Sequence, residues 1–197
     1  MILSIVKTIR ERLPFIWKLV EWANSWAISV LYLRKINETA ERVLDSVVSD
    51  YKYRVLREDD LSALCLVLAM QPKGFDVFFK PHDFDIDSLR KTFKNKAFLM
   101  LGVFDENEII GYFFIRFFVN HKAFRGKMVD VNFQGRGIAK NMGIVMTDIA
   151  LGAGFRLFAT ISRDNLSSLA SSKAVNEIRV VEELDDNYIY VEYLSKV

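Results

Sequence analysis

The sequence predicts an α/β (α+β) fold, with a central mixed, mostly antiparallel sheet flanked by helices and an N-terminal helical extension. After residue 50, short segments typical of strands are interleaved with segments of helical periodicity. Two pairs of neighbouring strand segments are separated by tight turns of Asp, Glu and Asn, which indicates antiparallel hairpins. With 51% hydrophobic residues over 197 positions, the chain can bury the core of one domain plus an extension.

Residues 1–50 form the predicted amphipathic helical extension, and residues 51–197 form the main domain. Pro14 should separate two helices, and a third helix is expected over residues 37–48. The longest uncharged window, residues 22–33, is shorter than the ~20 residues of a membrane span, and we expect no signal peptide. Three roles are open: a helical arm that packs on the domain or on a second copy as a homodimer, a contact with a membrane surface, or a substrate-side lid.

The elements of the main domain are expected in the order β-α-α-β-β-β-α-β-α-β-β. A segment rich in Pro, His and Asp, residues 75–87, should be irregular, and Asp87 or Ser88 should begin the short helix after it. The expected strands are 51–57, 97–104, 109–119, 123–131, 156–162, 178–183 and 188–193, and the expected helices are 59–70, 88–94, 138–151 and 165–174.

The strongest functional signal lies between the strand at 123–131 and the helix that follows it. Two glycines one residue apart, Gly135 and Gly137, separate these elements. A strand, a tight loop and a helix start direct unpaired backbone N–H groups and the positive end of the helix dipole at one small volume. Such a volume suits a phosphate or diphosphate. The spacing lacks the third glycine of a dinucleotide loop, and no Gly-Lys-Ser or Gly-Lys-Thr is present.

Residues 134–139 read Q-x-x-G-x-A, which resembles motif A (Q/R-x-x-G-x-G/A) of the GCN5-related N-acetyltransferase (GNAT) superfamily. The order of elements from Tyr51 to Tyr193 resembles that superfamily as well. The resemblance implies an enzyme that transfers acetyl from acetyl-coenzyme A (acetyl-CoA) to a primary amine by direct attack. The stretch Phe79-Lys80-Pro81-His82 is similar to acetyltransferases of surface-polysaccharide gene clusters, which implies an amino sugar on a nucleotide carrier as the acceptor. A peptide or small amine acceptor is an alternative. So is an inactive acyl-CoA-binding module docked through its N-terminal helices.

The resemblance also implies which residues hold the cofactor. The main-chain amides of the glycine loop would bind the diphosphate of acetyl-CoA, and the edge of the preceding strand would pair with the pantetheine arm. Asn165 lies where the family often has an Asn that contacts the cofactor, although a helix cap explains it equally. The predicted cofactor-binding residues are Val129, Val131, Gln134, Gly135, Arg136, Gly137, Ile138, Ala139 and Asn165.

Acyl transfer to an amine needs a base for the amine and benefits from an acid for the departing thiolate. His82 is the first candidate for the base, because an unperturbed histidine has a pKa near ~6.5; a surface histidine is the equal alternative. Asp83 and Asp130 are weaker bases, since a carboxylate needs burial for that role. Arg116, a lone charge in an apolar strand, either faces solvent or points into the acceptor cleft. The predicted substrate-binding residues are His82, Asp83 and Arg116.

The acid is less clear from the sequence. Where the family often has a Tyr that protonates the thiolate, this chain has Ser172, which is shorter and a poorer acid. Tyr188, Tyr190 or water could take the role instead. The predicted catalytic residues are therefore His82, Asp130, Ser172 and Tyr188.

Composition excludes other classes. A net charge of +2 with interspersed signs gives no indication of nucleic-acid binding. Two histidines exclude a His-rich metal site, and no metal is expected. The single cysteine, Cys65, excludes an internal disulfide and is typical of a reducing compartment. We therefore expect a cytoplasmic protein, with attachment to the inner membrane face as an alternative suggested by the N-terminal segment.

Overall fold

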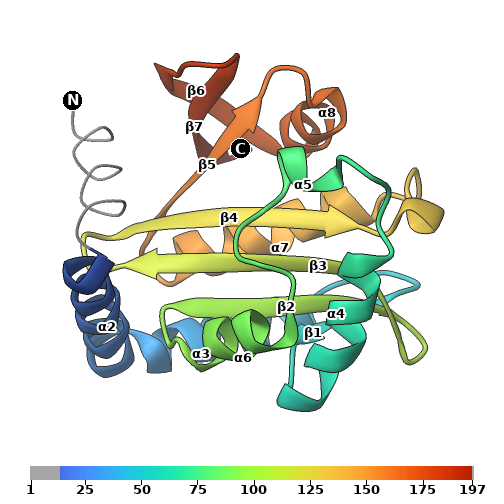
Figure 1. Ribbon diagram of the computed structural model, residues 1–197. Coiled ribbons are helices and arrows are strands. Elements are labelled where there is room, and N and C mark those ends of the chain that lie inside the picture. The colour runs from blue at the N-terminus through green and yellow to red at the C-terminus, as the bar shows by residue number, and fades with distance from the viewer. Residues whose placement is uncertain (1–13, 197) are drawn as a thin grey trace.

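The computed structural model describes residues 14–196, which form one seven-stranded sheet with helices on both faces (Figure 1). The strands lie in the order β1-β2-β3-β4-β5-β7-β6, and every neighbouring pair is antiparallel except β4 and β5. The predicted fold class is therefore confirmed. The strands are β1 (Lys52–Val55), β2 (Phe98–Asp105), β3 (Glu108–Phe118), β4 (Lys122–Val129), β5 (Arg156–Ser162), β6 (Asn176–Glu183) and β7 (Tyr188–Ser195).

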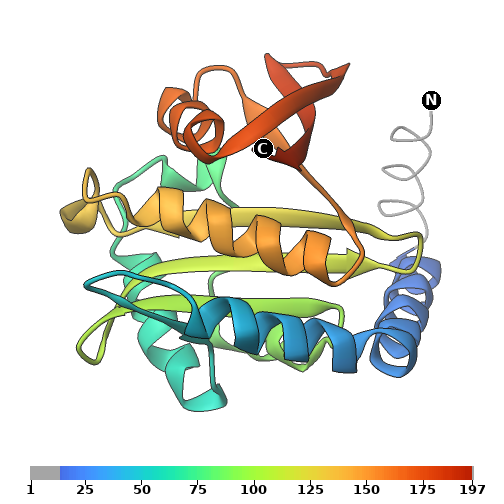
Figure 2. The same ribbon diagram turned by 180° about the vertical axis from the view of Figure 1, so that it is seen from behind.

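Helices α4 and α6 cover one face of the sheet, and α3 and α7 cover the other (Figures 1 and 2). Successive side chains of the central strands point to opposite faces of the sheet, so these strands contribute to the hydrophobic cluster on each face. Met100 and Tyr112 lie in the cluster under α4 and α6, whereas Leu101 and Phe113 lie in the cluster under α7. Burial of both faces explains why β2 and β3 read as almost continuous apolar runs. The helices are α2 (Pro14–Leu31), α3 (Leu33–Asp45), α4 (Leu61–Ala69), α5 (Phe75–Phe78), α6 (Ile86–Lys94), α7 (Ile138–Gly152) and α8 (Leu166–Val175), with 3₁₀ turns η1 (Glu58–Asp60) and η2 (Val131–Phe133).

The parallel pair β4–β5 is joined over a short length only. Lys122, Ala123 and Phe124 pair with Arg156, Leu157 and Phe158, and the two strands then separate. Both strands continue beyond that point, β4 pairing with β3 and β5 pairing with β7. Within residues 14–196, the C-terminal half of β4 therefore has one edge without a neighbouring strand.

The N-terminal helices differ in part from expectation. Helix α2 extends from Pro14, the first described residue, to Leu31, so the helix predicted after Pro14 is confirmed. Helix α3 begins at Leu33 and ends at Asp45, so the predicted range of 37–48 is wrong at both ends. The first turn of α3 carries Ile36 into the core, and Ser46 closes the helix by bonding to the carbonyl of Val43. The helix predicted before Pro14 lies outside the described residues, and the domain boundary at residue 50 stays a prediction.

The end of β4 also differs. The strand ends at Val129 rather than at Val131, because the carboxylate of Asp130 accepts the N–H of Asn132 at 2.9 Å and starts η2. Val131 is thus outside the strand edge on which it was predicted to bind a cofactor.

The segment predicted to be irregular contains one helical turn, α5. Helix α6 begins earlier than predicted, because Asp85 accepts the N–H groups of Asp87 and Ser88 and caps it.

Candidate active site

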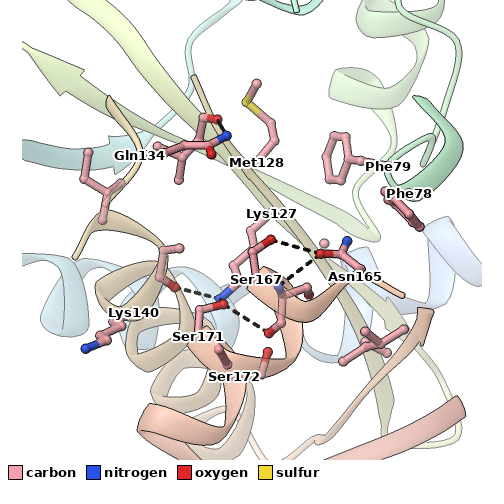
Figure 3. Close-up of a pocket in the computed structure, with 18 of the residues that line it drawn as sticks. Phe78, Phe79, Lys127, Met128, Gln134, Lys140, Asn165, Ser167, Ser171 and Ser172 are labelled. Carbon is pink, nitrogen blue, oxygen red and sulfur yellow. Dashed lines mark hydrogen bonds between the residues drawn. The ribbon is translucent and has the colours of Figure 1, made fainter. Parts of the chain in front are cut away.

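A cavity of about 740 Å³ lies where β4 and β5 separate. We call it the β4–β5 cavity. Figure 3 shows Lys140, Ser171 and Ser172 on one side of it and Phe78 and Phe79 on the other. Helices α7 and α5 lie on opposite faces of the sheet (Figures 1 and 2), and residues of both helices line the cavity.

The glycine loop forms one wall of this cavity. Gly135 and Gly137 have φ angles of +78° and +79°, a left-handed conformation that residues with a Cβ rarely adopt. A Cβ on either glycine would meet no atom within 4 Å. The loop therefore needs glycine for its backbone shape, and open space remains outside it.

The start of α7 leaves donors free. The helix begins at Ile138 directly after the loop, and no side chain of the described residues caps it. The N–H groups of Lys140 and Asn141 bond to the carbonyl of Gly137. Within residues 14–196, no acceptor is found for the backbone N–H groups of residues 134–139. Free amides at a helix N-terminus are suited to an anionic group such as a phosphate.

Most of the predicted cofactor residues line the cavity, and two do not. Arg136 donates to the hydroxyl of Tyr51 at 3.2 Å and to the carbonyl of Asn132 at 3.3 Å, outside the cavity wall. Val131 is exposed in η2. The predicted residues that line the cavity are Val129, Gln134, Gly135, Gly137, Ile138, Ala139 and Asn165.

Asn165 is a helix cap that also lies in the cavity wall. Its side-chain oxygen accepts the N–H of Ser168 and the hydroxyl of Ser167, each at 3.0 Å, so it caps α8. It lines the cavity as well.

Two cations in the cavity wall were missed by the sequence reasoning. Arg125 and Lys127 are two residues apart on β4, and both point toward α7. The buried Arg125 donates to the carbonyl of Gly143 and lies 3.3 Å above the ring centroid of Tyr193. The sequence did contain a signal for these two cations. They occupy alternate positions of a strand that is buried on both faces, where charged residues are uncommon.

The candidates for the acid occupy different places. Ser172 lines the cavity and is buried, with its hydroxyl 3.4 Å from that of Tyr193 and 3.4 Å from Arg125 Nη2. The hydroxyl of Tyr188 donates to the carbonyl of Val77 at 3.3 Å, and Tyr188 is not part of the cavity wall.

The candidates for the base and the acceptor site are not part of the cavity wall. His82 contacts Tyr112 of β3, and burial lowers the pKa of the imidazole. Asp83 is exposed, with a 3.9 Å contact to Lys80. Asp130 accepts a hydrogen bond from Gln71 at 3.0 Å in addition to its role in η2.

Arg116 is turned toward the N-terminal helix. Its guanidinium pairs with Glu21 of α2 and lies between the rings of Phe98 and Phe118. It does not line the β4–β5 cavity. The helix that supplies its carboxylate partner lies 95 positions earlier in the chain.

Solved structures resemble this arrangement. The GNAT domain of S. lividans PAT matches with a TM-score of 0.62 and 15% identity, over 73% of this chain and 90% of that chain. YncA from Salmonella typhimurium, solved with acetyl-CoA, matches with a TM-score of 0.58 and 15% identity, over 75% and 94%. The chain has the GNAT fold. The aminoglycoside acetyltransferase AAC(6')-Ib, solved with coenzyme A and kanamycin, shares that GNAT-like architecture with a TM-score of 0.58 and 11% identity, over 74% and 95%. No protein-family model and no curated protein matches the sequence.

Within the described residues, no group of three His, Cys, Asp or Glu is placed to hold a metal ion. Over residues 14–196, no helix is both long and apolar enough to span a membrane.

Proposed function

We propose that this chain is an acyl-CoA-dependent N-acyltransferase that moves acetyl from acetyl-CoA to a primary amine by direct attack. The observation that carries the proposal is the loop at 134–139, whose backbone N–H groups lack partners within the described residues and lie beside the β4–β5 cavity. The proposal is supported by the GNAT fold and by the position of this loop beside the cavity and the strand edge of β4.

The donor would occupy this arrangement from one end to the other. Its diphosphate would meet the free amides of the loop and the N-terminus of α7. Its pantetheine arm carries amide groups that can pair with the edge of β4 near Val129, as an added strand would. There they would replace the side chain of Gln134, whose Nε2 donates to the carbonyl of Val129 at 3.4 Å. The thioester would then lie between the separated strands, where a backbone N–H of β4 can stabilise the tetrahedral oxyanion.

The transfer itself needs two proton movements. We propose His82 as the base, because burial lowers the pKa of its imidazole and keeps it neutral near pH 7. In that role Nε2 would exchange its bond to the hydroxyl of Tyr112 for the proton of the amine. The thiolate would receive its proton on the side of α8. Ser172 lines the cavity there and Tyr188 does not, which favours Ser172, with the hydroxyl of Tyr193 beside it.

The acceptor is proposed to be an amino sugar, carried on a nucleotide in surface-glycan synthesis. The side of the cavity away from α7 is lined by three aromatic rings, those of Phe75, Phe78 and Phe79. Aromatic faces suit the apolar side of a sugar ring, and AAC(6')-Ib binds the aminoglycoside kanamycin in the same fold. A peptide or another small amine is the alternative acceptor, as in RimL, a ribosomal-protein α-N-acetyltransferase with a TM-score of 0.59 and 20% identity over 77% of this chain and 96% of that chain.

The test is thiol release from acetyl-CoA with a panel of amines, run beside calorimetric measurement of acetyl-CoA binding. The panel holds a nucleotide-linked amino sugar, kanamycin, a peptide with a free N-terminus and a simple diamine. Amine-dependent thiol release supports the proposed enzyme, and the preferred amine identifies the acceptor class. Tight binding without release on any amine supports the inactive acyl-CoA-binding module, and absence of binding overturns both.

The two sides of helix α2 differ in polarity, which suggests a surface through which the molecule attaches to a partner or a membrane. Its polar side is turned toward the domain: Asn24 bonds to the backbone of Phe117 and Val119, and Glu21 pairs with Arg116. Its other side is apolar and open to solvent. The side chains spaced three or four residues apart on that side are between 54% and 79% exposed: Phe15, Leu19, Trp22, Trp26 and Val30.

We propose that this apolar side lies on an anionic membrane surface. Two tryptophans on one exposed face are typical of a helix in the lipid interface. Residues 1–35 carry six Lys or Arg and two Glu, a charge that complements anionic lipid. Helix α2 lies at the end of the sheet opposite the glycine loop (Figure 1), so attachment there would leave the cavity open. A homodimer through the same side is the alternative.

A further inference from the structure

Lys127 is a lysine amine held inside the proposed acyl-donor site. It lies in the part of β4 that has separated from β5, and it lines the same cavity as the glycine loop (Figure 3). Its Nζ donates to the carbonyl of Ala139 in the first turn of α7 at 2.7 Å, and to the hydroxyl of Ser171 in α8 at 3.0 Å. The side chain therefore bridges the two helices that flank the cavity.

The surroundings of Lys127 disfavour a positive charge. Among the described residues, no carboxylate pairs with it or with Arg125, the cation beside it on β4. Both side chains approach Gly143 of α7, with Nζ 3.7 Å and the Arg125 guanidinium 3.9 Å from the position that a Cβ would occupy. The other titratable group facing this pair is Tyr193 of β7, which lies under the guanidinium. Burial, and then the charge of Arg125, lower the pKa of Lys127 to about 7.

The hydrogen bonds fit a neutral amine. A neutral amine has two N–H donors and one lone pair, whereas an ammonium has three donors. The two acceptors around Nζ, Ala139 O and Ser171 Oγ, satisfy both donors of the neutral form and leave its lone pair free. At neutral pH roughly half of the molecules would carry this form, whereas an unperturbed lysine is neutral in on the order of one molecule in a thousand.

We infer that Lys127 is a self-acylation site, at which the chain accepts the acyl group of its own bound acyl-CoA. The inference rests on the proposed function, which supplies the acyl thioester. The lone pair of Nζ attacks the thioester carbonyl carbon, the C–N bond forms, and the C–S bond breaks with its electron pair leaving on sulfur. The proton released from Nζ goes to the thiolate, so the products are N-acyl-Lys127 and free coenzyme A.

The modified side chain changes the site. An amide nitrogen has one N–H, so N-acyl-Lys127 can keep only one of its two bonds, to Ala139 or to Ser171. The acyl group adds volume to the cavity that the donor would occupy. Self-acylation would therefore slow further binding of donor, and it would report the local supply of acyl-CoA.

The experiment incubates the full chain with acetyl-CoA near neutral pH and follows intact mass and peptide maps. The exposed Lys140, which lines the same cavity, is the internal reference for uncatalysed acetylation. We expect Lys127 to gain one acetyl group at least about tenfold faster than Lys140, because its Nζ is held at the separated part of β4 with its lone pair free. The mass gain should disappear in Lys127→Arg, which keeps the cation without the reactive amine. It should also disappear in Gly137→Val, whose loop cannot hold the donor.

The outcomes separate this inference from the function on which it rests. If calorimetry shows that acetyl-CoA binds, yet Lys127 is acetylated no faster than Lys140, self-acylation is overturned and the proposed function stands. If acetyl-CoA does not bind, the proposed function fails and the inference fails with it. Equal labelling of Lys127 in the wild type and in Gly137→Val would also overturn the inference, because the reaction would not need the bound donor.

Discussion

Nε2 of His82 lies 3.0 Å from the hydroxyl oxygen of Tyr112, while Nδ1 of the same ring lies 2.8 Å from the carbonyl oxygen of Asp83. A carbonyl oxygen can only accept, so these contacts assign the ring proton to Nδ1. Nε2 then accepts the hydroxyl proton of Tyr112, a side chain that is fully buried. The two residues hold His82 in one orientation and one neutral tautomer.

Removing that hydroxyl should change how His82 titrates. In Tyr112→Phe the neutral imidazole loses its donor, so the pKa of His82 should rise from its lowered value. The imidazole proton signals in a pH titration by NMR measure the change, with Asp83 and Asp85 as the nearby carboxylates in both proteins. Tyr53→Phe is the matched control, since Tyr53 is buried and bonds to Ile138 instead. An unchanged titration of His82 in Tyr112→Phe would contradict the assigned hydrogen bond.

A substitution that strains the backbone of the glycine loop should weaken the binding of acetyl-CoA. Gly137→Ala places a Cβ on a residue with φ of +79°, which costs about 1–2 kcal/mol, and it should weaken acetyl-CoA binding measured by calorimetry. Gly154→Ala is the control: its φ is +92°, but it lies at the far end of α7, away from the cavity. Both variants should lose similar stability, and only Gly137→Ala should lose affinity. Equal affinity in the two variants would count against the loop as the diphosphate site.

The partly buried Lys127 should make stability depend on pH. Its pKa is lowered to about 7 in the folded chain from 10.5 in the unfolded chain, so the unfolded chain binds more protons between these values. The free energy of unfolding should therefore rise with pH from about 7 upward, with a limiting slope of roughly 1.4 kcal/mol per pH unit for one group. In Lys127→Met this rise should be absent, while Lys140→Met should behave as the wild type. Urea unfolding at several pH values up to about pH 9 measures the difference, and parallel curves for all three proteins would refute it.

The exposed apolar side chains of α2 should be required for binding to lipid vesicles. Replacing Trp22 and Trp26 with Ser should reduce co-sedimentation with vesicles that contain anionic lipid, because both indoles are more than half exposed. Leu66→Ser, at a site on α4 that is 65% exposed, is the matched control and should leave binding intact. Added salt should weaken the binding of the wild type. Failure of the wild type to bind such vesicles, together with dimers in solution that the Trp replacements dissociate, would favour the homodimer instead.

Prediction from the sequence was most accurate for elements whose structure depends on residues close to one another in the chain. The hairpin of β2 and β3 and the start of α7 follow from periodicity, turn residues and glycines that lie within a few positions of one another. The site residues depend on distant elements. Lys127 is bridged to Ser171, 44 positions later, and Arg116 is neutralised by Glu21, 95 positions earlier. Their surroundings therefore could not be read from residues near them in the sequence.

Because β4 and β5 pair over a short length only, the hydrogen-bond ladder between these two strands is incomplete. Strands β5, β7 and β6 are joined to the other four strands through three residue pairs between β4 and β5, and beyond those pairs no strand of residues 14–196 pairs with that edge of β4. A bound pantetheine arm would take the place of the missing strand. The donor would then act as a structural part of the protein as well as its substrate, and the seam should exchange its amide hydrogens far more slowly once it is filled.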